Sequence, residues 1–490
     1  MLIEKCDGNL SDSILHISKR LLADLNANGI NYCHWKNNHC INRSLAGKDD
    51  LDLLVREKDY DGFRSIITAL GFKEAYNRHI QFPGIFHFYG LDTPSGKLLH
   101  LHVHTRLVTG ESHTKNYHLP LEEMVLQNVR CHTSGCNIPE AEVDLIIYVL
   151  RYYIKISCLT GAYLLWKRKH YVRAEFDYSR CNVDNHKIDH LLERYFCFFT
   201  PGFFHEMVAA LASKSSFMKR ISLGLQLRKN IKTLRRLSAM RTMWARYYQV
   251  IYRALNKVLM KKKKSLSRGG RIIAVTGLDG SGKSTVNRRL LQWLKPVLNV
   301  RLYHVGRPKP VCETLMLRGL LKTKKSLNSN SHKDAAPRIH QRNILFAMRY
   351  LVLAYERYRL LRKADKLRAK GYFVFCDRYP SLNFGAMDSP KIGQVQGQYL
   401  YNLFGTWEKE LYAAMPIPDA VYNLKIPVDL ALERNRVRIK GHKESDAQMR
   451  YRYKNYSDLQ YRAGYYEVID AARELPHMMK DIKAKIWKRI

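Results

Sequence analysis

A stretch just past the middle of the chain combines glycines, a lysine and hydroxyl side chains at the spacing of a phosphate-binding loop. It reads GLDGSGKST over residues 277–285 and follows an apolar run, IIAV, at residues 272–275. Glycines let the backbone turn so that successive N–H groups point at one phosphate, and the N-terminus of a following helix adds a favourable dipole. The pattern therefore predicts a strand, a loop and a helix that together bind ATP with Mg²⁺.

The residue types of this loop also predict individual roles. We expect Lys283 to neutralise phosphate oxygens during catalysis and Ser284 to ligate Mg²⁺ through its hydroxyl group. A carboxylate at Asp279 would repel the ATP phosphates, so we expect it to face the acceptor as a catalytic residue that holds a hydroxyl group or a metal-bound water. The expected ATP-binding residues of the loop are Gly277, Gly280, Ser281, Gly282, Lys283, Ser284 and Thr285.

A second apolar run ends in an acid and a base, GYFVFCDRYP at residues 371–380. Ligands of open parallel sheets gather at the carboxyl ends of the strands, which is where Asp377 would lie. We expect Asp377 to hold Mg²⁺ through water and Arg378 to clamp a phosphate with its planar fork of donors, as a catalytic and substrate-binding residue. The alternative is a surface ion pair between the two side chains.

A third segment, residues 418–446, places a cluster of cations after a strand-like run. Phosphoryl transfer spreads negative charge over the moving group, and the cations of a closing lid can stabilise that charge while they exclude water. We therefore expect Arg434 to contact ATP and Arg438 to act in catalysis. The alternative is a helix with solvated arginines. The cations are Arg434, Arg436, Arg438, Lys440 and Lys443.

Together these three segments resemble the thymidylate kinase family over roughly residues 270–485. The resemblance implies a P-loop α/β fold and ATP- and Mg²⁺-dependent phosphorylation of a nucleoside monophosphate, with dTMP first. It also implies substrate contacts from Tyr379 and from Arg357, which ends the AYER segment at 354–357 and corresponds to a base-facing arginine. The family's Thr-Arg-Glu-Pro-Gly is replaced by VGRPK at 305–309, where Arg307 keeps the cationic character. Alternative acceptors are a sugar, a glycan or a polynucleotide end, and the alternative to an enzyme is a nucleotide-controlled polyanion-binding protein.

Near the N-terminus, two acids alternate along a strand-like run, GKDDLDLLV at residues 47–55. Asp50 and Asp52 would point to one strand face, where two carboxylates can hold a divalent metal ion. Histidines at positions 100, 102 and 104 alternate in the same way. We expect these groups to converge in one cleft around Mg²⁺ or another divalent ion, with Lys48 as a neighbouring base.

The paired acids resemble the Asp-x-Asp pattern of the nucleotidyltransferase superfamily. That family's preceding Gly-Ser is replaced here by CHWKNN at residues 33–38, and a histidine would replace its third acid. Three interpretations follow: an active nucleotidyltransferase, a degenerate domain that kept only the fold, or a histidine–aspartate metal site without nucleotidyl transfer.

The elements that would position these residues fall into three segments. Residues 1–140 mix short strands and helices, as in an α+β nucleotidyltransferase-like domain. Residues 141–260 are helical and strongly basic and end in a linker. Residues 270–490 alternate strands and helices, which predicts a parallel sheet with flanking helices in a P-loop domain.

The charge balance predicts a polyanionic partner. The chain carries 83 Lys and Arg residues against 43 Asp and Glu, a formal net charge of +40, and no acid occurs between Glu206 and Asp279. Residues 207–270 would thus bind nucleic acid, an anionic glycan or an anionic membrane surface; the alternative is a solvated helical face.

Cysteine spacing and hydropathy suggest a cytoplasmic location. The ten cysteines form no repeated pair that would suit a zinc site or a disulfide framework, and the first residues do not read as a signal peptide. The most apolar helical run, residues 145–166, is interrupted by Arg151 and Lys155. We expect a soluble protein, membrane-associated at most, with a homodimer as one alternative for its oligomeric state.

Overall fold

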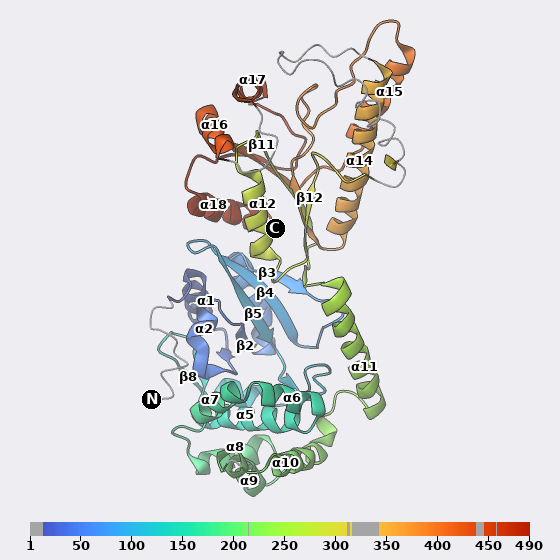
Figure 1. Cartoon of the computed structure of the whole chain (residues 1–490). Helices are drawn as coiled ribbons and strands as arrows, with labels where there is room; N and C mark the ends of the chain where they lie inside the picture. The colour runs from blue at the N-terminus through green and yellow to red at the C-terminus, as the bar shows by residue number, and fades with distance from the viewer. Residues whose placement is uncertain (1–12, 214, 311–313, 316–342, 438–444, 457) are drawn as a thin grey trace. The chain divides into compact units, whose positions relative to one another are not determined.

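The structure, a computed structural model, describes residues 13–213, 215–310, 314–315, 343–437, 445–456 and 458–490 (Figure 1). The chain forms two compact units. The first contains residues up to Lys262 together with Ala484–Arg489, and the second contains Lys263–Lys483 together with Ile490. Each unit has its own sheet.

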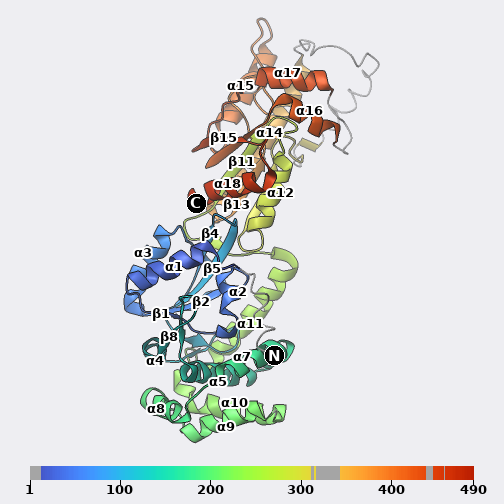
Figure 2. The same cartoon turned by 90° about the vertical axis from the view of Figure 1, so that its left-hand side faces the viewer.

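In the first unit, five strands lie in the order β1-β2-β5-β4-β3. Strands β2 and β5 are parallel, whereas β1–β2, β5–β4 and β4–β3 are antiparallel. Helices α1 and α3 cover one face of this sheet and share a core with it (Figure 2). The elements are α1 (His16–Ala27), β1 (Tyr32–His34), β2 (Leu51–Val55), α3 (Tyr60–Ala69), β3 (Lys73–Tyr76), β4 (Ile85–Asp92) and β5 (Lys97–His104).

Shorter elements connect this sheet to the helices that follow. Two of them are small antiparallel hairpins, β6–β7 and β8–β9. The connecting elements are η2 (Asn38–Cys40), α2 (Ile41–Leu45), η3 (Glu57–Asp59), β6 (Val108–Thr109), β7 (Tyr117–His118), α4 (Glu122–Gln127), β8 (Val129–Cys131) and β9 (Asn137–Pro139).

Helices fill the stretch from residue 141 to 260, as the sequence predicts. They share one apolar core with residues of the preceding segment, among them Trp35, Leu54 and Leu107. The boundary expected near residue 140 therefore does not separate two compact units. The helices are α5 (Ala141–Ile156), α6 (Leu159–Lys167), α7 (Lys169–Ser179), α8 (Asn185–Tyr195), α9 (Pro201–Ala212), α10 (Phe217–Asn230), η4 (Lys232–Leu234), α11 (Ala239–Leu255) and η5 (Asn256–Met260).

The sheet of the second unit is parallel, with strands in the order β12-β13-β11-β14-β15. The predicted alternation of strands and helices is confirmed. The central strand β11, RIIAVTG, is apolar because helices cover both faces of a parallel sheet. The elements are β10 (Ser265–Leu266), β11 (Arg271–Gly277), α12 (Lys283–Leu294), β12 (Val300–His304), α14 (Ile344–Ala369), β13 (Phe373–Asp377), α15 (Tyr399–Ala413), β14 (Ala420–Lys425), α16 (Val428–Arg436), α17 (Asp446–Tyr456), β15 (Tyr466–Asp470) and α18 (Leu475–Lys488).

The strand order places a switch point at β11. Its neighbours β13 and β14 lie on opposite sides, and open α/β sheets bind ligands at the carboxyl ends of the strands at such a point. Within the described residues, no helix has both the length and the apolar composition needed to cross a membrane.

Candidate functional site

The loop after β11 has the backbone geometry of a phosphate cradle. Gly277, Gly280 and Gly282 have φ values of 137°, 87° and 88°, which residues with a side chain rarely adopt. A Cβ atom at Gly277 would also come within 2.5 Å of the Leu424 carbonyl oxygen. Helix α12 begins at Lys283, directly after Gly282, so that its N-terminal N–H groups lie at the loop. The predicted strand, loop and helix are confirmed.

Lys283 is nearly buried inside this loop. Its side chain is 7% exposed, its Nζ donates a hydrogen bond to the Leu278 carbonyl at 2.7 Å, and it lies 3.7 Å from Asp279 Oδ1. Burial, together with the nearby Arg378 guanidinium, lowers the pKa of Lys283 to about 8. A phosphate bound in the loop would reverse that shift by stabilising the ammonium form.

The carboxylate of Asp279 is surrounded by cations. Its Oδ1 accepts a hydrogen bond from Arg378 Nη2 at 2.7 Å, and its Oδ2 accepts one from Arg452 Nη1 at 3.2 Å. Burial alone would raise the pKa of Asp279, but Arg378, Lys283 and Arg452 lower it below its usual value. The acid that the sequence shows inside a phosphate-binding loop is therefore offset by three cations.

Arg378 links this loop to a second acid. Its Nη1 lies 3.3 Å from Asp388 Oδ2. Both residues have left-handed backbones, with φ values of 72° at Arg378 and 67° at Asp388. Such a conformation costs a residue with a side chain about 1–3 kcal/mol and is found where surrounding contacts enforce it, often at functional sites. Arg378 thus pairs with Asp279 and Asp388, and not with the adjacent Asp377 as the surface-pair alternative supposed.

Arg357, which the family resemblance assigns to the substrate, has several protein contacts in this structure. Its side chain is 4% exposed, and its guanidinium is bonded to protein groups. It donates to the carbonyls of Val305 and Gly306 at 3.2 and 2.9 Å, and to Asp388 at 2.7 Å. A further bond reaches the Tyr412 hydroxyl at 2.6 Å. Arg357 therefore positions Asp388 and the loop after β12.

Asp377 ends β13, and one of its two carboxylate oxygens is bonded to a neighbouring strand. Its Oδ2 lies 2.9 Å from His304 Nδ1 on the neighbouring strand β12, whereas its Oδ1 is buried and has no hydrogen bond. Ser284 is exposed in the first turn of α12. A carboxylate and a hydroxyl are the oxygen ligands that Mg²⁺ accepts, directly or through water, so these residues fit the ion that the sequence predicts.

The remaining expected residues lie outside this network. Tyr379 is buried in an apolar core and its hydroxyl donates to the Pro416 carbonyl. Arg307 is exposed, and Arg434 donates to the Ala471 carbonyl at 3.3 Å. Arg438 lies outside the described residues, as do the lid lysines at 440 and 443.

Four residues of the network were not expected from the sequence. They are His304, Asp388, Arg452 and Tyr453, whose hydroxyl donates to the Asp279 carbonyl at 3.0 Å. His304 could have been found, because it ends a strand that pairs in parallel with the strand ending at Asp377. Asp388 and Arg452 come from a loop and a helix with no recognisable motif.

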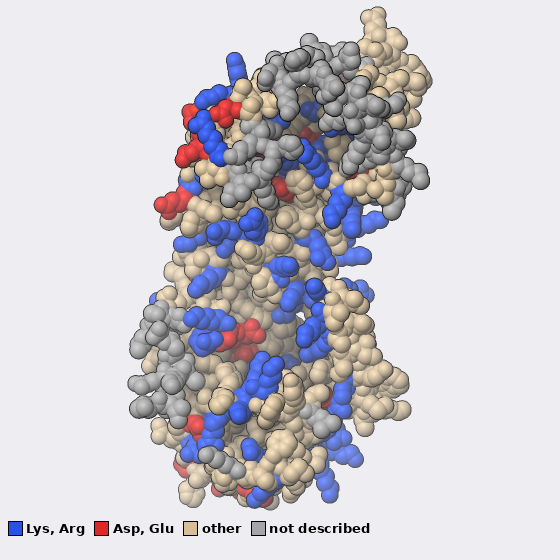
Figure 3. Space-filling view, viewed as in Figure 1, with Lys and Arg blue, Asp and Glu red and all other residues tan. Residues whose placement is uncertain are grey.

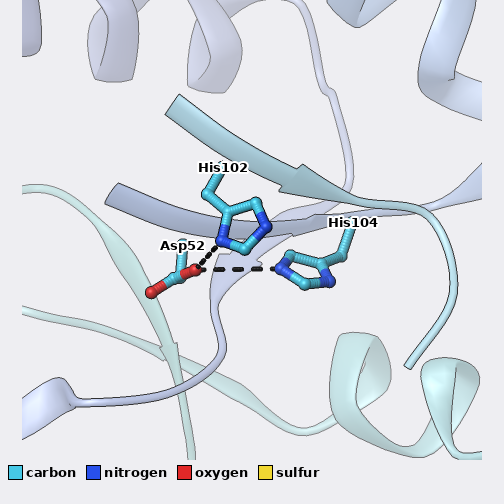
Figure 4. A group of neighbouring side chains, drawn as sticks. All are labelled: Asp52, His102 and His104. Atoms are coloured by element: carbon cyan, nitrogen blue, oxygen red, sulfur yellow. Dashed lines mark hydrogen bonds and ion pairs between the residues drawn. The ribbon is translucent and has the colours of Figure 1, made fainter. Parts of the chain in front are cut away.

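A second candidate site lies in the first unit, where β2 and β5 place Asp52 opposite His102. Figure 4 shows the Asp52 carboxylate beside two imidazoles, with Oδ1 lying 2.7 Å from His102 Nδ1 and 3.7 Å from His104 Nε2. The expected approach of the acidic and histidine strands is confirmed. Asp50 points to a different partner, His100.

A lysine that the sequence did not single out lies beside Asp52. Lys36 Nζ forms an ion pair with this acid, at 2.8 Å from Asp52 Oδ1. Burial alone would raise the pKa of Asp52, but Lys36 and the two histidines hold it well below its usual range. Burial lowers the pKa of both imidazoles, for His104 to about 3, so they are neutral at physiological pH.

These three side chains could hold a metal ion. Their ligand atoms all lie within 4.8 Å of one another. His104 is 1% exposed, and neither of its ring nitrogens has a hydrogen bond. Two neutral imidazoles and one carboxylate suit Zn²⁺ or a similar transition metal better than Mg²⁺, which prefers oxygen ligands.

Comparisons with known proteins relate part of this chain to kinases. No protein-family model matches it. It is 27% identical over 219 residues to the thymidylate kinase of Plasmodium falciparum (isolate 3D7), which covers 45% of this chain and 90% of the relative. It is 26% identical over 178 residues to the uncharacterized ATP-binding protein YghR of Escherichia coli (strain K12), which covers 33% of this chain and 68% of the relative.

Among solved structures, a deoxyadenosine kinase from M. mycoides is 17% identical, with a TM-score of 0.26 over 44% of this chain and 98% of its own. The sequence matches show modest homology to a P-loop kinase over less than half of the chain. None of the three relatives is described as a nucleotidyltransferase, so that activity stays a prediction.

Proposed function

We propose that the second unit is an ATP-dependent kinase, with a nucleoside monophosphate such as dTMP as its first candidate acceptor. The observation that carries the proposal is the linked set Lys283, Asp279, Arg378 and Asp388 at the phosphate-binding loop. Asp279 contacts both Lys283 and Arg378 and so holds a second cation near the lysine. A loop that only bound nucleotide would not need this second cation. The homology to a thymidylate kinase supports the same reaction class.

Different residues of the second unit would bind the phosphate donor, ATP, and the phosphate acceptor. Loop N–H groups and Lys283 would hold the ATP phosphates, while Ser284 and Asp377 would hold Mg²⁺. When bound, Mg²⁺ supplies neutralisation of phosphate charge and orients the transferring group. Because phosphoryl transfer adds little covalent chemistry for the protein, most of the rate enhancement would come from this positioning and charge stabilisation.

On the acceptor side, Arg378 is the candidate anion clamp. Its guanidinium lies between two carboxylates, Asp279 and Asp388, at 2.7 and 3.3 Å. An acceptor phosphate would compete with these acids for the guanidinium, and Asp279 would then be able to accept a hydrogen bond from the attacking group. This exchange requires that Arg378 keep its charge, which an arginine does at any physiological pH.

One observation favours a second acceptor class, a sugar or glycan. Arg357, which the resemblance assigned to a nucleobase, is committed to Val305, Gly306 and Asp388. The acids that remain near the loop are hydrogen-bond acceptors suited to hydroxyl groups. A polynucleotide end stays a further alternative because of the basic surplus of the chain.

The acceptor can be identified by measuring ADP release from Mg-ATP with nucleoside monophosphates, sugars and polynucleotide ends in parallel. The proposal expects release that depends on one of these acceptors and is lost in Lys283→Ala. Release that no acceptor stimulates would leave the nucleotide-controlled polyanion-binding protein as the better account.

For the first unit we propose a transition-metal site at Asp52, His102 and His104. The observation behind it is His104, which is buried without a hydrogen bond although its Nε2 faces Asp52 at 3.7 Å. Lys36 would have to withdraw from Asp52, which its long, flexible side chain permits.

A further inference from the structure

Helix α11 (Ala239–Leu255) belongs to the first unit and packs against the rest of it through its polar side. Arg246 Nε lies 2.8 Å from Glu111 Oε2, Gln249 Nε2 donates to the His79 carbonyl at 2.6 Å, and Arg253 Nη2 donates to the Ser112 carbonyl at 2.9 Å. Thr242 accepts a hydrogen bond from Asn116 at 2.7 Å. These four positions follow helical spacing, so they define one inner face.

The opposite side of the same helix is apolar and exposed. Successive residues turn by about 100° around a helix, which places the outer stripe opposite the inner face. Trp244 is 63% exposed and Leu259, in η5, is 72% exposed. The exposed apolar residues of α11 on this side are Met240, Met243, Trp244, Tyr247, Ile251 and Leu255.

This arrangement is the reverse of an ordinary surface helix, which turns its apolar stripe toward the core. A contiguous apolar surface of this kind marks a site that binds a partner or a membrane. In Figure 3 the surface over α11 is largely tan, with Lys and Arg side chains beside it. The stripe continues into η5 (Asn256–Met260), where Val258 is exposed as well.

The charged residues of the segment that carries this stripe are all positive. No Asp or Glu lies between Glu206 and Asp279, and exposed Arg241 and Lys257 flank the stripe. Lysines at positions 261–264 follow directly after η5. An apolar stripe with Trp, flanked by cations and free of acids, is the composition of a helix that lies in the interface of an anionic bilayer.

We propose that α11, η5, Lys261 and Lys262 dock the protein on an anionic lipid surface, with the apolar stripe inserted between headgroups. A nucleic acid would leave Met240, Met243 and Leu255 against charged phosphates and is therefore a poorer occupant. A second copy of the chain would bring the same cations face to face without acids to pair them. The proposal does not depend on the kinase activity.

The test is flotation of the full-length protein with vesicles of neutral phosphatidylcholine alone or mixed with anionic phosphatidylglycerol, at low and high salt. We expect binding to anionic vesicles that weakens with salt and little binding to neutral ones. The triple substitution Trp244→Ser, Leu255→Ser and Leu259→Ser should weaken vesicle binding at least tenfold, because it removes apolar side chains that would insert between the headgroups. Each of these residues is exposed, so we expect the variant to fold.

A matched control removes the same residue types from the second unit, where Trp407, Leu400 and Leu382 are exposed. The triple substitution of these residues to Ser should leave vesicle binding unchanged. Equal binding by the α11 variant and the wild type would overturn the proposal and leave only unspecific attraction to the lysines. Absence of vesicle binding, or a salt-stable dimer that the α11 variant loses, would also overturn it.

Discussion

The two units surround a carboxylate with different partners. In the second unit, Asp279 lies among the cations Arg378, Arg452 and Lys283, which would attract phosphate. In the first unit, Asp52 lies beside one lysine and two imidazoles. Burial lowers the pKa of both imidazoles, so these two side chains are neutral. The comparison teaches that the partners of an acid decide which ligand its site favours: cationic partners favour an anion, and neutral imidazoles favour a metal ion.

Removing the loop lysine should give the largest effect. Lys283→Ala should lower kcat by about 10²–10³, because phosphate charge loses its nearest stabilising group. Asp52→Asn in the other unit should leave kcat unchanged. Acceptor-dependent ADP release measures both variants, and circular dichroism checks that they are folded. Near-normal turnover in folded Lys283→Ala would contradict the assignment of phosphoryl transfer to the second unit.

Metal binding should depend on the first unit, whereas phosphoryl transfer should depend on the second. Co²⁺ or Zn²⁺ titrated into the full-length protein should bind roughly 10–100-fold more weakly to His104→Ala than to wild type, because a ligand is lost. His100→Ala is the matched control, since His100 pairs with Asp50 outside the three-residue cluster. Calorimetry or the Co²⁺ absorption spectrum reports binding. Equal affinity of wild type and Asp52→Asn would reduce the cluster to a structural role.

Arg378→Lys tests the acceptor clamp. A point charge replaces a planar fork, so we expect KM for the acceptor to rise about tenfold while KM for ATP changes little. Steady-state kinetics with each substrate varied in turn separates the two. An equal loss for ATP and acceptor would show that Arg378 supports the whole loop through Asp279 and does not clamp the acceptor.

The pKa of Lys283, about 8, predicts a smaller effect on nucleotide binding. Above pH 8 the free protein loses this proton, whereas bound phosphate favours the charged form. Binding of a non-hydrolysable ATP analogue should therefore weaken as pH rises, with uptake of about one proton per nucleotide at pH 9 and little at pH 7.5. Calorimetry in buffers of different ionisation enthalpy measures the uptake. It should vanish in Lys283→Arg, and persistence there would assign the proton to another group.

The same two regions show how far the sequence alone could lead. The loop at residues 277–285 was predictable because glycine, lysine and serine act there through the local backbone. The approach of Asp52 to the histidines was predictable, because residues that alternate along a strand share one face. The contact from Lys36 was not predictable, because this residue reaches Asp52 from a loop. Asp388 and Arg452 could not be predicted, since their roles depend on packing between distant segments.

Arg357 has contacts that a family resemblance does not predict. The residue lies where the motif predicts, yet its donors are bonded to Asp388 and to the carbonyls of Val305 and Gly306. Only the packing of α14 against the loop after β12 reveals this. The same holds for Tyr379, whose hydroxyl turns to the Pro416 carbonyl.

Transfer of the γ-phosphate itself tests the central claim most directly. ATP labelled at the γ-phosphate would be incubated with Mg²⁺, the protein and each candidate acceptor, and the products separated. The account predicts that the label moves to one acceptor with wild type and with Asp52→Asn, and that Lys283→Ala transfers almost none. Label found only in inorganic phosphate, whatever acceptor is present, would contradict it.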